Sequence, residues 1–134
     1  MAKYFTFGEL CKSDVALQKR IENTPTDAVT IERMNTLMDE CLDRVRALWG
    51  KPIGVNSGYR SVALNRAVGG EINSQHLRGE AADITTGSKA NNRKLFELIV
   101  ASDIPFDQLI DEKGYRWLHI SYRKGYNRKQ VLHK

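Results

Sequence analysis

The strongest constraint on the fold is a stripe of apolar side chains between residues 30 and 49. The stripe consists of Ile31, Met34, Met38, Cys41, Val45 and Leu48. Steps of three and four residues place side chains on one face of an α-helix. Thr30 stands where an N-cap is needed, and Gly50 followed by Pro52 ends the pattern. The sequence therefore predicts a helix from Thr30 to Trp49 whose apolar face packs against a core.

Shorter periodic segments surround this helix. We expect short helices within residues 9–21 and 61–68, an amphipathic helix over 91–102, and strands over 53–56, 81–85, 108–111 and 116–122. Ser13 is suited to cap the first short helix. The last two strands form a hairpin around Lys113 and Gly114. This order predicts an α+β fold over residues 1–134, a single domain in which helices pack on a small antiparallel sheet.

Length and composition place the chain among soluble globular domains. It has 134 residues, of which 41% are hydrophobic and 28% charged. No apolar run is long enough to span a bilayer, and residues 1–14 lack the apolar region of a secretory signal. We therefore expect a monomer without a membrane segment, made in the cytoplasm. Cys11 and Cys41 suggest no disulfide framework, and both are expected to be reduced.

The net charge of +5 has two interpretations. Basic residues gather toward the C-terminus, where they could attract polyanions such as anionic wall polymers, or could form only a solvated face. No nucleic-acid-binding motif accompanies them, so we expect no nucleic-acid partner.

Three residues in two segments form a candidate metal site. His76 and Asp83 lie seven residues apart, and a loop followed by a strand could direct both at one ion. In the strand around His119, alternation places Leu118 on one face and His119 on the other, polar face. This spacing occurs often by chance, and His76, Asp83 and His119 could each be an ordinary hydrogen-bonded residue. The helix-borne HExxH motif is absent.

Two imidazoles and one carboxylate suit zinc. A catalytic zinc site usually has three protein ligands and leaves the fourth position to water, whose pKa falls to about 7. Structural zinc sites are more often closed by cysteines, and neither Cys11 nor Cys41 is near these residues in the sequence. The pattern thus favours one catalytic Zn²⁺ ion, although another divalent metal fits the same ligands.

Several blocks together resemble the zinc D-alanyl-D-alanine carboxypeptidase family, whose members cut the peptide stems of peptidoglycan. The blocks are YFTFGEL at 4–10, VNSGYRS at 55–61, SQHLRGEAAD at 74–83 and WLHISY at 117–122. In particular, the chain resembles the short single-domain members common in phages and prophages. The resemblance implies the fold that these peptidases share with Hedgehog-type signalling domains.

The resemblance also assigns roles to individual residues. It implies His76, Asp83 and His119 as the zinc ligands. It further implies that Arg60 holds the substrate by a carboxylate or carbonyl, because a planar guanidinium pairs with two oxygen atoms. Ser57 is a second candidate for substrate binding. The alternatives are a structural ion pair for Arg60 and a role in shaping the turn for Ser57.

The general base is the least determined residue. Some members of the family carry an acidic residue three positions before the last histidine, where this chain has Arg116. Others carry it after a Gln-Leu-Ile block, which here is followed by Asp111 and Glu112. We predict Glu112 as the catalytic base and hold Asp111 in reserve, because strand alternation depends on a register that the sequence does not give. Glu80 is a further candidate that we expect to be exposed.

These observations predict a zinc metallopeptidase that hydrolyses peptidoglycan peptides. Water activated by zinc would attack the scissile carbonyl, with carboxypeptidase, endopeptidase and dipeptidase specificities all open. We expect a phage or prophage enzyme of cell-wall degradation, an endolysin, that another factor delivers to the wall. The alternatives are a zinc-containing binding module that recognises wall peptide or a protein partner, and a structural protein that zinc only stabilises.

Overall fold

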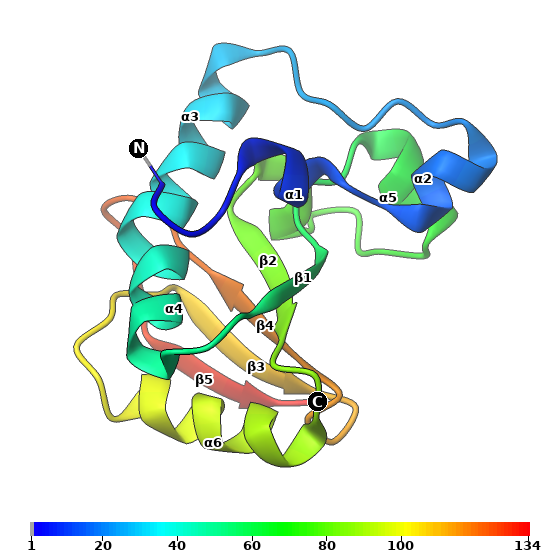
Figure 1. Cartoon of the computed structure of the whole chain (residues 1–134). Coiled ribbons are helices and arrows are strands. Elements are labelled where there is room, and N and C mark those ends of the chain that lie inside the picture. Colours follow the sequence, from blue (N-terminus) through cyan, green and yellow to red (C-terminus); the bar gives the residue numbers. More distant parts are fainter. Residues whose placement is uncertain (1) are drawn as a thin grey trace.

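The computed structural model describes residues 2–134, and its centre is a sheet of five strands in the order β1-β2-β4-β3-β5 (Figure 1). The strands are β1 (Gly54–Ser57), β2 (Ala81–Thr85), β3 (Gln108–Glu112), β4 (Trp117–Ser121) and β5 (Gln130–His133). The pairs β1–β2, β2–β4 and β3–β4 are antiparallel, whereas β5 pairs in parallel with β3. The α+β class is confirmed, but the expectation of an antiparallel sheet is wrong for its last pair.

The long apolar stripe forms one continuous rod of three parts. These are α3 (Ala28–Leu37), a π-helical turn η1 (Met38–Leu42) and α4 (Asp43–Trp49). Leu37 joins the stripe in the core. The π-helical turn then adds one residue, so that Leu42 is also buried while Leu48 is 38% exposed. Asp27, not Thr30, is the N-cap, since its carboxylate accepts the backbone N–H of Thr30. Gly50 ends the rod in a left-handed conformation, as predicted.

Four shorter helices begin at hydroxyl-bearing caps. They are α1 (Phe7–Cys11), α2 (Asp14–Lys19), α5 (Val62–Ala67) and α6 (Lys89–Val100), which follow Thr6, Ser13, Ser61 and Ser88. Each cap accepts a backbone N–H from the first turn of its helix, which satisfies a donor that has no partner within the helix. The predicted cap at Ser13 is confirmed. The short helix η2 (Gln75–Arg78) has 3₁₀ geometry.

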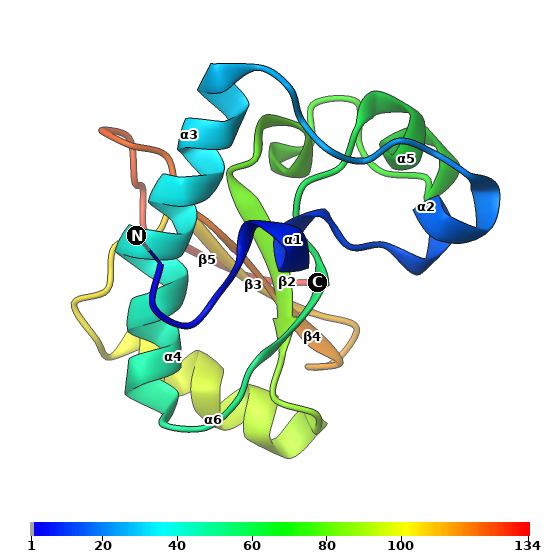
Figure 2. The same ribbon diagram turned by 45° about the horizontal axis from the view of Figure 1, so that its top comes forward.

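One face of the sheet is buried under the helices. Ala82 and Ile84 of β2 and Leu118 and Ile120 of β4 are fully buried and belong to the apolar core. The same core includes side chains of α3, α4 and α6. Figures 1 and 2 show the α3–α4 rod along one side of the sheet and α6 across its lower end. The alternate residues of β2 and β4 therefore face away from the core.

Within residues 2–134, no helix is long and apolar enough to cross a membrane. Cys11 and Cys41 are both free thiols, as predicted. Burial raises the pKa of the Cys41 thiol to about 12, so this side chain is a neutral part of the core.

Candidate metal centre

The pairing of β2 with β4 sets the centre of the site. Asp83 and His119 are direct partners across this antiparallel pair, so their side chains leave the sheet on the same face. His119 Nδ1 lies 3.1 Å from Asp83 Oδ1. The predicted orientation of His119, opposite to Leu118 and Ile120, is therefore confirmed.

His76 reaches the same point from η2, which Ser74 caps and Gly79 ends in a left-handed conformation. The imidazole is buried, with its Nδ1 2.7 Å from the carbonyl oxygen of Gly58 and its Nε2 3.3 Å from Asp83 Oδ1. A carbonyl oxygen can only accept a hydrogen bond, so His76 Nδ1 carries a proton. In the tautomer with its only proton on Nδ1, the lone pair of Nε2 points toward Asp83.

The three side chains form a compact cluster. One ligand atom each from His76, Asp83 and His119 lies within 4.8 Å of the others. The two imidazole rings meet edge to face with their centroids 5.2 Å apart. The structure thus brings together the three residues that the sequence singled out as metal ligands.

The charge on Asp83 suits a cation. Burial alone would raise its pKa, but the adjacent rings of His119 and His76 together outweigh burial and hold the pKa of Asp83 well below its usual range. When both rings are neutral, their lone pairs and the carboxylate can face one another only around a cation. Two imidazole nitrogens and one carboxylate oxygen are a donor set typical of zinc with an open fourth position. The residues present therefore fit a zinc ion.

Arg60 lies at the edge of this cluster. Its Nη2 is 3.5 Å from Asp83 Oδ2, its Nε donates to Ser57 Oγ and its Nη1 donates to Asn65 Oδ1. Burial lowers the pKa of Arg60 and the charge of Asp83 raises it, with burial the larger effect. The structure thus contains the ion pair that we weighed as the alternative for Arg60, and it places the guanidinium beside the candidate metal ligands. Ser57 contacts Arg60 rather than the cluster.

The register of β3 separates the two candidate bases. Glu112 pairs with Trp117, and Ile110 pairs with His119, so the side chain of Glu112 shares the face of His119. Asp111 points to the opposite face, where it is buried and contacts His133. Of the two acidic residues, only Glu112 lies on the side of the metal cluster.

An open cleft of about 660 Å³ surrounds the cluster. Its walls include Arg60, His76, Asp83, Glu112, Trp117 and His119. Most of the side chains that line the cleft are polar or charged. The candidate ligands, Arg60 and Glu112 therefore open onto the same cleft.

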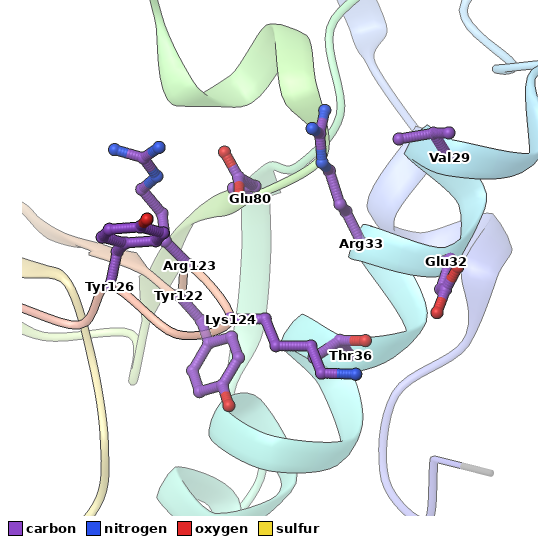
Figure 3. Close-up of a pocket in the computed structure, with 9 residues that line it drawn as sticks. All are labelled: Val29, Glu32, Arg33, Thr36, Glu80, Tyr122, Arg123, Lys124 and Tyr126. Carbon is purple, nitrogen blue, oxygen red and sulfur yellow. The ribbon is translucent and has the colours of Figure 1, made fainter.

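A smaller cavity of about 320 Å³ lies elsewhere, between α3 and residues 122–126 (Figure 3). Glu80 lines this cavity instead of the cleft, and its carboxylate accepts a hydrogen bond from Arg78 Nε at 2.8 Å. Glu80 is 7% exposed, so the expectation that it is exposed is wrong. Its separate location argues against a role as the catalytic base.

Two residues that contact the site, Gln75 and Asp107, were not predicted from the sequence to have a role there. Gln75 Oε1 lies 3.3 Å from His119 Nε2, and Gln75 Nε2 donates to Asp107 Oδ2 at 2.8 Å. Gln75 precedes His76, but adjacency in the sequence gave no sign that it contacts His119. Asp107 stands before a strand and has no motif around it that could have drawn attention to it.

Comparisons with known proteins agree with this geometry. The model of a family described as peptidase M15 matches residues 3–121. The zinc D-Ala-D-Ala carboxypeptidase of Streptomyces albus G is 54% identical over 43 residues, which are 32% of this chain. These residues span only 17% of that relative's length.

Proposed function

The chain belongs to the peptidase M15 family, and from this premise we propose that it is a zinc-dependent peptidase that hydrolyses peptide bonds in peptidoglycan stems. One observation carries the proposal. Two imidazole nitrogens and a carboxylate oxygen converge in an open cleft that also holds an arginine and a second carboxylate. The similarity to the Streptomyces carboxypeptidase supports both the metal and the class of substrate.

His76, through Nε2, and His119, through Nδ1, would hold the zinc ion together with the carboxylate of Asp83. Zinc bound there supplies Lewis acidity, which polarises a carbonyl group and makes water more acidic. The chain's own contribution is to keep the three donors in place. Gly58 and the β2–β4 pairing do so, because they fix the ring of His76 and the positions of the other two side chains.

Arg60 is suited to bind and orient the substrate. Its guanidinium lines the cleft and could pair with a terminal carboxylate or a carbonyl of a wall peptide. Ser57 Oγ and Asn65 Oδ1 accept from two of its nitrogens and limit the rotation of the side chain. We therefore propose that Ser57 acts on the substrate through Arg60 rather than by direct contact.

Glu112 is suited to move the proton. On the side of the cluster, its carboxylate can take a proton from the attacking water and deliver it to the amide nitrogen that leaves. This transfer turns a poor leaving group into a neutral amine. Trp117, the cross-strand partner of Glu112, lines the same cleft and can cover one side of the bound peptide.

Digestion of purified peptidoglycan tests the proposal. Zinc-loaded protein, chelator-treated protein and chelator-treated protein with zinc restored would each be incubated with the wall, and the soluble products identified by mass spectrometry. We expect chelator-sensitive release of D-alanine from a carboxypeptidase, or of stem peptides from an endopeptidase. No release by protein shown to contain zinc would refute the proposal and favour a binding module.

A further inference from the structure

A line of hydrogen bonds leads from His119 away from the cleft. His119 Nε2 lies 3.3 Å from Gln75 Oε1, and Gln75 Nε2 donates to Asp107 Oδ2 at 2.8 Å. Arg128 then donates to both carboxylate oxygens of Asp107, from Nε at 2.8 Å and from Nη2 at 2.9 Å. The ring of His119 is thus connected to a residue on the segment before β5.

We propose that Gln75, Asp107 and Arg128 are positioning residues that make His119 present Nδ1 to the metal. The proposal rests on the zinc site inferred above. It goes beyond that site, because none of the three residues belongs to the metal cluster. Their effect on the metal passes entirely through the ring of His119.

The chemistry of the amide explains the direction of the effect. A glutamine side chain can offer His119 either its oxygen or its NH₂ group. An ionised carboxylate only accepts, so Asp107 attracts the NH₂ group and leaves Gln75 Oε1 for the ring. His119 Nε2 must then carry the proton, and the lone pair of Nδ1 points at Asp83.

The reverse arrangement would disable the site. With the NH₂ group of Gln75 toward the ring, Nε2 would accept and the proton would move to Nδ1. A protonated Nδ1 cannot bind a metal ion, and Nε2 faces away from Asp83. The orientation of one amide therefore decides whether His119 is a ligand.

Asp107 is held firmly enough to impose this choice. The residue is fully buried, its backbone N–H donates to Ser121 and its carbonyl accepts from Gln130. Hydrogen bonds from Arg128 keep its carboxyl group ionised, because they hold its pKa below the ordinary value. Contacts from β4, from β5 and from Arg128 thus hold Asp107 in place.

Arg128 lies beyond residues 3–121, the part that matches the family. The connection therefore gives the segment that contains β5 a role at the metal, although β5 contributes no residue to the cluster. Residues 122–134 thus support the metal centre indirectly, through the contact of Arg128 with Asp107.

Zinc affinity provides the first test. It would be measured for wild-type protein and for Gln75→Leu, Asp107→Asn and Arg128→Gln by competition with a chelator of known affinity. Loss of a hydrogen-bond partner behind a metal-binding histidine typically weakens metal binding about 10–100-fold, and we expect this loss for Gln75→Leu. Arg44→Gln removes an exposed ion pair with Asp103 and serves as the control with unchanged affinity.

The protonation of His119 provides a readout that a purely structural role would not change. In ¹⁵N spectra of zinc-loaded wild-type protein, we expect His119 to carry its proton on Nε2 and to exchange it slowly with solvent. In Gln75→Leu the same proton should exchange faster. The side chain of Arg128 is 55% exposed, so Arg128→Gln should fold even if Gln75→Leu does not.

A double variant separates orientation from loss of packing. In Asp107→Asn, an NH₂ group can face the NH₂ group of Gln75, whereas Gln75→Glu combined with Asp107→Asn pairs a donor with an acceptor again. We expect the double variant to bind zinc more tightly than Asp107→Asn alone. Affinities within twofold of wild type for folded Gln75→Leu and Arg128→Gln, or a proton on Nδ1 of zinc-loaded His119, would overturn the inference.

The two proposals can fail independently. If zinc-loaded protein does not digest peptidoglycan but Gln75→Leu still loses zinc affinity, the function is wrong and the positioning role stands. If the wall is digested and zinc affinity is unaffected in the folded variants, the positioning role alone is wrong.

Discussion

Replacing Gly79 by Ala should destabilise the protein far more than the same change at Gly50. Both glycines adopt a left-handed conformation, with φ of +74° and +75°. They differ in what a Cβ atom would meet. At Gly50 nothing lies within 4 Å, whereas at Gly79 the new atom would lie 2.7 Å from Met34 Cγ and 3.0 Å from the carbonyl oxygen of Thr30.

The pair therefore separates two energetic costs. A left-handed alanine costs about 1–2 kcal/mol, and this cost applies equally at both positions. Crowding a packed core adds about 1–3 kcal/mol, and it applies only at Gly79, because Met34 is fully buried and Thr30 contributes helix backbone. We expect losses of about 1–2 kcal/mol for Gly50→Ala and about 2–5 kcal/mol for Gly79→Ala.

Chemical denaturation of the metal-free proteins would measure both values, and zinc titration would follow. Because Gly79 ends the helical turn that carries His76, relief of the clash should shift this ring, so Gly79→Ala should bind zinc more weakly. Gly50→Ala should keep its zinc affinity. Equal free energies of unfolding for the two variants would refute the steric argument.

Three other perturbations test single residues of the site. Glu112→Gln should lower kcat by about 10²–10⁴-fold while zinc stays bound, and an unchanged kcat would exclude Glu112 as the base. Arg60→Lys keeps the charge but loses the planar fork, so KM for a wall peptide should rise more than kcat falls; an unchanged KM would argue against substrate binding by Arg60. Hydrogen bonds from Arg128 and then Gln75 hold the pKa of Asp107 low, so its stabilising effect is present above its unfolded pKa and disappears as the pH falls below it. Below about pH 4, wild-type protein should therefore lose stability more steeply than Asp107→Asn, and parallel denaturation curves would contradict this assignment.

Much of the site could be predicted because it lies on regular structure. Alternation along a strand is sufficient to separate His119 from Leu118, and the structure confirms that separation. The choice between Asp111 and Glu112 could not be made in this way. It depends on how β3 pairs with β4, which is decided by contacts between distant parts of the chain.

The errors in the predicted fold have local physical causes. Asp27 and Thr30 are both good N-cap residues, so the pattern alone could not decide between them. Steps of three and four residues do not reveal the extra residue of a π-helical turn. The strand β5 has only four residues, and its parallel pairing with β3 was not apparent from the sequence.

A contact between distant segments also explains why Gln75 and Asp107 were overlooked. Their connection becomes visible only when the segment before β5 returns to the sheet and brings Arg128 to Asp107. Such contacts between distant segments have no signature in residue spacing. The three metal-ligand candidates, in contrast, are histidines and an aspartate, residue types that commonly bind metal ions and can be singled out in a sequence.

The most direct test of this account is an anomalous difference map at the zinc absorption edge from crystals of zinc-loaded protein. We predict one peak per chain, about 2.0–2.2 Å from His76 Nε2, from a carboxylate oxygen of Asp83 and from His119 Nδ1. A map with no peak among these three side chains, or with zinc bound elsewhere, would contradict the proposed metal centre and the peptidase mechanism that depends on it.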